Sequence, residues 1–276
     1  MNVVIAGNVI FEKYHLNGNN FIIIDERIND ISDHSEIASR LCDVKQSVGA
    51  DSVLFLQESG RADVRMRIFE QDGSESDMCG NGIRCIILFM HRHDGGDAFT
   101  IETNSGIMRG ELQDGIVQMD VGTLQNPRRY LNKMENFTEV NRNILSIRLN
   151  GRMFYVLCAG EPHAVLVDDN CETDLRDFME FARNPELFPR GININVISVQ
   201  DDNTIRNRTL ERGVWDYTTS CGTGSICCAV VAREIGCNRE KITVMNDIGS
   251  QQIQFNRRRI ISSARPNYVF TGEMEI

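Results

Sequence analysis

The chain alternates between short apolar runs and polar turns that contain glycine, asparagine or aspartate. Runs rich in β-branched and aromatic residues predict strands at 2–12, 20–25, 53–59 and 64–71. Residues 34–46 predict a helix, because Ile37, Leu41 and Val44 recur on one side at helical spacing. Asp33 stands where an N-cap is expected. The pattern therefore predicts a chain that mixes strands and helices.

The second half of the chain repeats the organisation of the first half. In each half, short strands lead to a helix that opens with glycines, predicted over 80–91 and over 222–235, and a further helix is predicted over 172–183. The two helix starts align as Cys79-Gly-Asn-Gly-Ile-Arg-Cys85 and Cys221-Gly-Thr-Gly-Ser-Ile-Cys227. Such self-similarity indicates an internal duplication that carries a cysteine in the same place twice.

A cysteine at the start of a helix is suited to acid/base chemistry. The free backbone N–H groups and the positive end of the helix dipole favour an anion, so we expect the pKa of such a thiol to fall. The same N–H groups bind a carboxylate. Two such helix starts, at Cys79 and Cys221, would hold one carboxylate and place a sulfur on either side of it. This arrangement predicts removal of an α-proton on one face of an amino acid and return of a proton on the other.

Composition excludes several classes of function. The chain has 41% hydrophobic and 25% charged residues, which is typical of a globular protein, and its net charge of -10 opposes nucleic-acid binding. No apolar stretch approaches the roughly 18 residues of a membrane span, and the first residues lack the pattern of a signal peptide. We therefore expect a cytoplasmic protein that binds neither nucleic acid nor membrane.

The other cysteines predict neither disulfides nor a structural zinc site. The nine cysteines are odd in number and include no C-x-x-C pair. We predict that Cys42, Cys158, Cys171 and Cys237 are small buried apolar residues.

The two cysteine motifs and several other segments resemble the diaminopimelate epimerase family over nearly the whole chain. The segments are HLNGNNF, GADSVLFL, DGSESDMCGNGIRC, EPHAVLVDD, FPRGININV, ERGVWDYTTSCGTGS and YVFTGE, in that order. The resemblance implies an α/β (α+β) fold of two pseudo-symmetric domains, each a mixed or antiparallel, barrel-like sheet wrapped around a central helix. One domain would comprise 1–124 completed by 264–276 and carry Cys79, and the other would comprise 125–263 and carry Cys221. The domains would close over the substrate, with no pyridoxal phosphate and no metal.

The resemblance also implies roles for individual residues. Cys79 and Cys221 would be the two acid/base thiols, and His163 and Glu211 would orient them or adjust their protonation. Backbone N–H groups for the reacting carboxylate would come from Gly80, Asn81, Gly222 and Thr223. The residues that hold the substrate would include Asn19, Asn193 and Arg212.

Two positions depart from the family pattern. The family usually has asparagine where this chain has Glu70 and Glu161, and both positions would contact the end of the substrate away from the reacting carbon. Two carboxylates there would repel a distal carboxylate of the substrate and attract a cationic group. We therefore expect a basic amino acid, such as lysine, ornithine, arginine or histidine, as the substrate. Arg212 argues against this, because it matches the residue that binds the distal carboxylate, and either glutamate could pair with it.

Other functions stay open from the sequence. The first alternative is a true diaminopimelate epimerase. Less favoured are a proline or hydroxyproline racemase, a thiol switch in which Cys79 and Cys221 form a reversible disulfide, and a non-catalytic amino-acid binding protein. We expect a small amino-acid substrate as the binding partner. The sequence leaves open whether the protein forms a homodimer.

Overall fold

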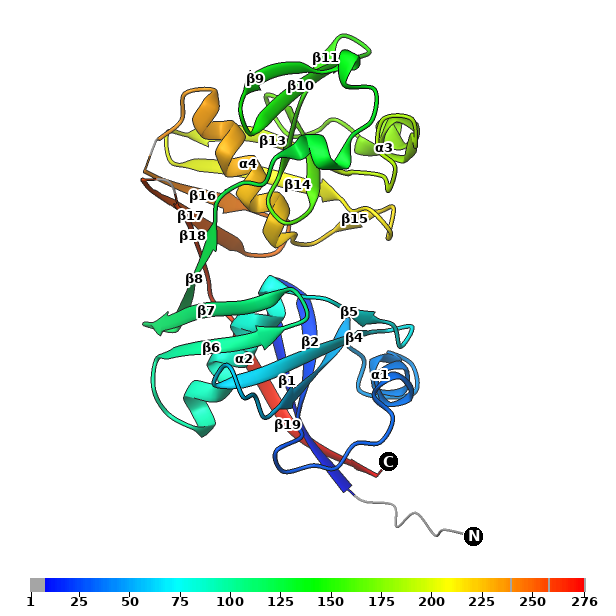
Figure 1. Cartoon of the computed structure of the whole chain (residues 1–276), viewed down its shortest axis with the longest axis vertical. Coiled ribbons are helices and arrows are strands. Elements are labelled where there is room, and N and C mark those ends of the chain that lie inside the picture. Colours follow the sequence, from blue (N-terminus) through cyan, green and yellow to red (C-terminus); the bar gives the residue numbers. More distant parts are fainter. Residues whose placement is uncertain (1–7, 239, 258, 276) are drawn as a thin grey trace. The chain divides into compact units, whose positions relative to one another are not determined.

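The computed structural model describes residues 8–238, 240–257 and 259–275 (Figure 1). The chain divides into two compact units. Unit 1 contains the described residues up to Met119 and those from Ala264 onward, and unit 2 is Asp120–Ser263. Residues 2–7 of the first predicted strand lie outside the described residues.

Unit 1 consists mainly of strands, with a long helix and a shorter one. Its elements in chain order are β1 (Asn8–Leu16), β2 (Asn19–Asp25), α1 (His34–Cys42), β3 (Ser52–Gln57), β4 (Val64–Glu70), β5 (Glu75–Ser76), α2 (Gly80–His93), β6 (Ala98–Thr103), β7 (Gly106–Gln113), β8 (Ile116–Gly122, which runs into unit 2) and β19 (Asn267–Glu275).

Unit 2 has the same character. Its elements are η1 (Pro127–Tyr130), η2 (Met134–Asn136), β9 (Thr138–Asn141), β10 (Ile144–Leu149), β11 (Arg152–Cys158), β12 (Pro162–Val167), η3 (Leu175–Phe178), α3 (Met179–Arg183), β13 (Asn193–Asp201), β14 (Thr204–Leu210), β15 (Tyr217–Thr218), α4 (Gly222–Glu234), β16 (Lys241–Met245), β17 (Ser250–Asn256) and β18 (Arg259–Ala264).

The order of strand pairing is the same in both units. In unit 1, β2 pairs parallel with β3, β3 antiparallel with β4, and β4 parallel with β6. In unit 2, β12 pairs parallel with β13, β13 antiparallel with β14, and β14 parallel with β16. The short strands β5 and β15 each pair antiparallel with the strand before them and lead into α2 and α4. This repeated pairing confirms the predicted pseudo-symmetric α/β fold.

Each long helix packs against several strands of its own unit. α2 contacts β1, β2, β6, β7 and β19, and α4 contacts β11, β12, β13, β14, β16 and β17. The side chains of Ile83, Cys85, Ile86 and Ile87 are all 0% exposed. Burial of this much apolar surface fixes α2 firmly, and with it the position of its first turn.

Two predicted helices are shorter in the structure than in the sequence pattern. α1 begins as expected, with the Asp33 carboxylate accepting a hydrogen bond from the Glu36 N–H at 2.9 Å, but it ends at Cys42. Val44 lies beyond this end and is 75% exposed, so its prediction as a buried helix residue was wrong. The helix predicted over 172–183 is a 3₁₀ turn followed by the five-residue α3, because the Asp174 side chain caps a turn at the N–H of Arg176.

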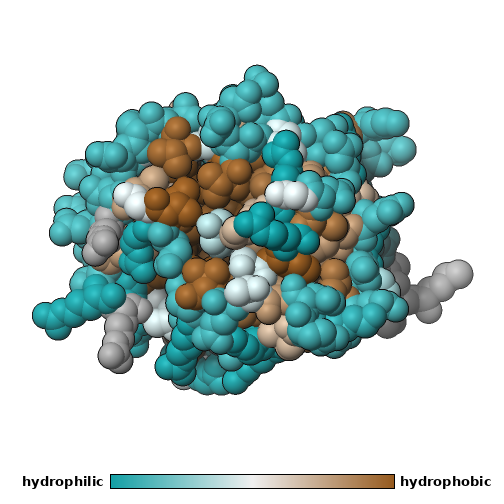
Figure 2. Space-filling view, turned by 90° about the horizontal axis from the view of Figure 1, so that it is seen from above, coloured by the Kyte–Doolittle hydropathy of each residue, from teal (hydrophilic) through white to brown (hydrophobic). Residues whose placement is uncertain are grey.

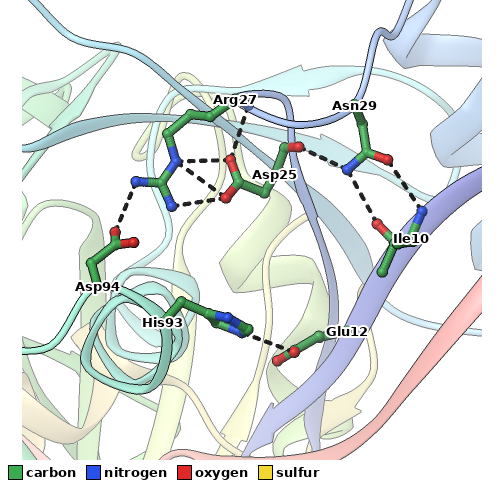
Figure 3. A network of polar contacts seen from close by, with 7 residues as sticks. All are labelled: Ile10, Glu12, Asp25, Arg27, Asn29, His93 and Asp94. Atoms are coloured by element: carbon green, nitrogen blue, oxygen red, sulfur yellow. Dashed lines mark hydrogen bonds and ion pairs between the residues drawn. The ribbon is translucent and has the colours of Figure 1, made fainter.

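A polar network fixes the C-terminal end of α2 to the sheet of unit 1 (Figure 3). Nε2 of His93 lies 2.9 Å from the Glu12 carboxylate on β1. The Arg27 guanidinium donates to Asp94, the C-cap of α2, at 2.8 Å and to Asp25 at the end of β2. The Arg27 guanidinium and its two carboxylate partners hold one another by charge-assisted hydrogen bonds.

The cysteines outside the two motifs are buried. Cys42, Cys158, Cys171 and Cys237 are between 0% and 8% exposed, which confirms their prediction as buried residues. All nine cysteines are free thiols.

The molecular surface includes apolar areas. Figure 2 shows a face on which hydrophobic residues gather in the middle and hydrophilic residues surround them. Within the described ranges, no helix is long and apolar enough to span a membrane.

Candidate active site

Cys79 is the N-cap of α2 and forms the first cysteine centre with the residues around it. Its backbone is extended (φ -137°, ψ 117°), and its sulfur accepts a hydrogen bond from the Gly82 N–H at 3.5 Å. α2 starts with Gly80, so the unpaired N–H groups of the first turn lie beside this sulfur. Cys79 therefore lies at the positive end of the α2 dipole.

A chain of side-chain amides leads from the first turn of α2 to an acidic residue. Nδ2 of Asn81 donates to Oδ1 of Asn19 at 3.3 Å, and Nδ2 of Asn19 donates to the Asp51 carboxylate at 3.0 Å. Asp51 also accepts from the N–H of Asn20 at 2.7 Å. The structure thus brings together two predicted substrate-binding residues, Asn19 and Asn81, and adds Asp51, which sequence reasoning missed.

Glu70 ends β4 close to the first cysteine centre. Its two carboxylate oxygens accept hydrogen bonds from the hydroxyls of Ser52, at 2.8 Å, and Ser76, at 2.6 Å. Ser76 lies in β5, three residues before Cys79. In the part of the chain that the structure describes, Glu70 forms no ion pair. Neutral donors therefore hold this carboxylate, and they leave its negative charge in place.

Arg84 is a buried cation that sequence reasoning did not single out. It is 2% exposed, and its guanidinium folds back to donate to the carbonyl of Gly80 at 2.9 Å. Burial lowers the pKa of Arg84 to about 10, and the nearby Cys79 opposes this shift. A buried cation near the positive end of a helix needs an anion beside it. The sequence did contain a signal for Arg84. The two motif copies differ at this position, where the second copy has Ile226.

Cys221 occupies the same position before α4 and forms the second cysteine centre with its neighbours. It is 9% exposed, and its backbone is extended. Burial, with a smaller contribution from Glu211, raises the pKa of the Cys221 thiol to about 12. The expected fall of this pKa at a helix start was therefore wrong for Cys221, since desolvation outweighs the helix dipole. Cys221 is a thiol, the form that an acid requires.

The hydrogen bonds of His163 define its protonation. Nδ2 of Asn195 donates to Asn207 at 3.0 Å and to Thr209 at 2.6 Å, so Oδ1 of Asn195 faces Nδ1 of His163 at 2.8 Å. An amide oxygen only accepts, so His163 carries its proton on Nδ1 and has an acceptor at Nε2. Burial lowers the pKa of His163 to about 4, which keeps the ring neutral.

Thr223 connects this imidazole to the cysteine. Its hydroxyl oxygen lies 3.0 Å from Nε2 of His163 and 3.5 Å from the sulfur of Cys221. Because Nε2 accepts the hydroxyl proton, the thiol donates to the hydroxyl oxygen. A chain of donors runs from Cys221 through Thr223 to His163. The sequence assigned Thr223 only a backbone role, so the role of its side chain was missed.

Glu161 and Arg212 form an ion pair in unit 2. Nη2 of Arg212 lies 3.1 Å from Oε1 of Glu161. Asn193 links the two residues, since its Nδ2 donates to Glu161 at 3.3 Å and its Oδ1 accepts from the N–H of Arg212 at 2.8 Å. The structure thus brings together three predicted substrate-binding residues. It also shows that Arg212 pairs with a glutamate, a possibility that the sequence left open.

Chemically different side chains lie beneath the two helix starts. A Cβ at Gly82 would lie 3.2 Å from Leu54 of β3, whereas a Cβ at Gly224 would lie 2.9 Å from Asn195 of β13. Leu54 is opposite an isoleucine of β4, and Asn195 is opposite a threonine of β14. The first helix therefore begins over apolar side chains and the second over a buried polar network. Duplication produced the same backbone with unequal surroundings for the two sulfurs.

The remaining predicted residues lie near these centres. Glu211 follows β14 directly, and its charge acts on Cys221. Gly222 is the first residue of α4. In the described ranges, no group of three or more His, Cys, Asp or Glu side chains is arranged to hold a metal ion.

Comparisons with known proteins agree with this geometry. The sequence profile described as Diaminopimelate epimerase matches residues 11–125 and 155–264. The diaminopimelate epimerase of Methanocella arvoryzae is 36% identical over 279 residues, which covers 96% of each chain. Among solved structures, a phenazine biosynthesis protein of the PhzF family from Bacillus anthracis has a TM-score of 0.67 at 15% identity, covering 98% of this chain and 100% of that one. A hydroxyproline epimerase from Agrobacterium vitis has a TM-score of 0.59 at 13% identity, covering 97% and 91%.

The two structural likenesses concern the fold alone, because their sequence identities are low. The relative and the profile cover far more than half of this chain. The chain therefore belongs to the diaminopimelate epimerase family, and it is an isomerase of the epimerase and racemase type.

Proposed function

We propose that the chain inverts the α-carbon of a basic amino acid, such as lysine, ornithine, arginine or histidine, with Cys79 and Cys221 acting on opposite faces of that carbon. The observation that carries the choice of substrate is the ion pair between Glu161 and Arg212. The choice of cysteines rests on their matched places before α2 and α4.

The chemistry requires one thiolate and one thiol. The thiolate takes the α-proton, so a C–H bond breaks and an S–H bond forms, while backbone N–H groups at the helix starts bind the carboxylate that gains charge. The thiol on the other face then gives its proton to the carbon and becomes a thiolate. Burial favours Cys221 as the thiol in the substrate-free protein, and it outweighs the opposing effect of the Thr223 hydrogen bond. Cys79, which interacts with the cationic Arg84, is the thiolate that completes the pair.

The Glu161–Arg212 pair bears on the distal end of the substrate. By resemblance, Arg212 stands where the family binds a second carboxylate. In this chain the guanidinium already has a carboxylate partner at 3.1 Å, and Asn193 holds both residues in place. A substrate with a distal carboxylate would have to compete with Glu161 for this guanidinium, and the repulsion between the two carboxylates adds a cost. A substrate that lacks this carboxylate avoids that cost.

Glu70 adds an attraction for a cationic side chain. Two serine hydroxyls donate to its carboxylate, and in the described part of the chain no cation pairs with it. Asp51 directly precedes β3, the strand that pairs with β4, and carries a second carboxylate. A substrate ammonium, guanidinium or imidazolium is favoured beside such groups, and a carboxylate is repelled.

The test is exchange of the α-proton in deuterated water. The reduced protein is incubated with single enantiomers of lysine, ornithine, arginine, histidine, diaminopimelate and proline, and the α-proton signal is followed by NMR. We expect exchange and inversion with at least one basic amino acid and little with diaminopimelate. Cys79→Ala and Cys221→Ala should each abolish inversion. Diaminopimelate turned over much faster than every basic amino acid would contradict the proposed substrate.

A pair of substitutions tests the two departures from the family. Glu161→Asn frees Arg212, and Glu70→Asn removes the remaining charge, so the double variant should gain turnover of diaminopimelate and lose turnover of the basic substrate. Glu111→Asn with Glu172→Asn, at one exposed glutamate of each unit, is the charge-matched control and should leave the preference unchanged. An unchanged preference in the double variant would show that these two glutamates do not determine the choice of substrate.

A further inference from the structure

Unit 2 contains a cavity whose lining is strongly basic. Its volume is about 740 Å³, and five arginines line it: Arg129, Arg142, Arg233, Arg257 and Arg259. No described lining residue is an aspartate or a glutamate. This is unexpected in a chain with a net charge of -10. The concentration of guanidinium groups in one cavity therefore needs a specific explanation.

Segments that are distant in the sequence form this cavity. The arginines come from η1, the β9–β10 turn, the last turn of α4, the β17–β18 turn and the start of β18. None of these residues belongs to either cysteine centre. Five like charges brought together by four separate stretches of the chain repel one another, and this repulsion is relieved when an anion binds among them.

Few of these charges are balanced by carboxylates. Arg259 pairs with Asp120 at 2.5 Å. In the ranges that the structure describes, Arg129, Arg142 and Arg257 form no ion pair. Their planar forks suit the oxygen pairs of phosphate groups, which they can bind by two hydrogen bonds each. A ligand with one negative charge would leave most of the cavity charge unbalanced.

The cavity also has an apolar part. Arg233 stacks on the ring of Phe255 at 4.1 Å, and Leu124, Val230 and Ile260 contribute aliphatic surface. Sites for small organic ligands occupy roughly 300–1,000 Å³, so this volume accommodates more than an inorganic anion. We propose that this arginine cavity is a binding site for an organic polyphosphate, of the class of nucleoside diphosphates and triphosphates, separate from the cysteine centres.

The test is calorimetric titration of the full chain with ATP, tripolyphosphate, citrate and adenosine at moderate salt. ATP should bind with saturation, tripolyphosphate and citrate should bind more weakly, and adenosine should not bind. Binding of ATP should weaken as salt rises, because the contacts are ionic. The double variant Arg129→Gln and Arg142→Gln should weaken ATP binding by about a hundredfold, since each charge-assisted contact contributes strongly.

The control removes two exposed arginines of unit 2 that do not line the cavity. Arg148→Gln with Arg152→Gln changes the net charge equally and should leave ATP binding unchanged. Thermal unfolding shows that both double variants are folded. Absence of saturable ATP binding, or equal loss in both double variants, contradicts the site. If tripolyphosphate binds as tightly as ATP, the apolar part of the cavity does not contribute to binding. If citrate binds more tightly than ATP, the ligand is not a phosphate.

Discussion

The hydroxyl oxygen of Thr223 lies 3.0 Å from Nε2 of His163. The same oxygen lies 3.5 Å from the sulfur of Cys221. A neutral, buried imidazole thus acts on the cysteine through a hydroxyl group and not by direct contact. Thr223 is therefore a positioning residue, and removal of its hydroxyl should change the rate of inversion.

Thr223→Val keeps the shape of the side chain and removes the hydroxyl. We expect kcat for inversion to fall by about 10–100-fold, since the thiol loses its oriented partner, with little change in KM. Thr223→Ser should restore most of kcat, because serine supplies the same hydroxyl. Steady-state rates measured by polarimetry with the substrate found by proton exchange provide the check. A serine variant as slow as the valine variant would contradict the role of the hydroxyl.

His163 makes stability depend on pH in a defined window. Its folded-state pKa of about 4 lies below the ordinary value of 6.5, because burial disfavours the charged ring. Its contribution to stability is therefore complete above pH 6.5 and is lost as pH falls toward 4, where the unfolded chain binds a proton that the folded chain refuses. Between pH 7 and pH 5 this loss amounts to about 2 kcal/mol.

The measurement is urea unfolding at pH 7 and pH 5 for the wild type and for His163→Gln. Glutamine offers an amide donor to Asn195 and does not titrate. Other groups titrate in both proteins, so the difference between them isolates His163. An equal loss of unfolding free energy in the two proteins would show that His163 is not held neutral in the folded state.

Arg84 is expected to increase the reactivity of Cys79. Its guanidinium lies at the carbonyl of Gly80 and interacts with the Cys79 sulfur, so it favours the thiolate. Arg84→Met should slow alkylation of Cys79 by iodoacetamide at pH 7.5 several-fold, and Arg84→Lys should slow it less. Mass spectrometry of the two cysteine peptides gives both rates from one sample. Cys221 has Ile226 at the matching position and serves as the internal reference. A parallel change at both cysteines would indicate a general loss of structure.

The two motif glycines should respond differently to alanine. A Cβ at Gly224 would meet the Asn195 amide at 2.9 Å and the His163 ring at 3.2 Å, and both groups are held by hydrogen bonds. At Gly82, the nearest atoms are the terminal methyls of Leu54, at 3.2 and 3.3 Å. We expect Gly224→Ala to lower the free energy of unfolding by about 1–3 kcal/mol, as overpacking does, and Gly82→Ala to lower it by less than that. Urea unfolding of the two variants side by side tests the order.

Much of the fold could be predicted because it follows from local patterns. Apolar alternation located β3 and β4, and the duplicated motif located the starts of α2 and α4. The end of α1 was less predictable, because Val44 continues the apolar spacing while the backbone at Asp43 is extended (φ -62°, ψ 112°). Periodicity records which side chains are apolar, but it does not record where the backbone leaves the helix.

The candidate site was predictable in part for a similar reason. Cys79 and Cys221 stood out because their motifs occur twice. Thr223 also lies in a motif, but its side-chain bonds depend on His163, which is 60 residues away along the chain. The elevated pKa of Cys221 likewise depends on burial, which no local motif reveals.

The pairing of β1 with β19 affects how the protein is made. The two strands match from Asn8 with Glu275 to His15 with Asn267, so the sheet of unit 1 includes residues that are translated after all of unit 2. A ribosome that has added residue 263 has supplied all of unit 2, while β1 still lacks its partner. The amino-terminal unit, although synthesised first, is thus the one that completes its sheet last. A chain terminated before β19 would leave β1 with an open edge available to other chains.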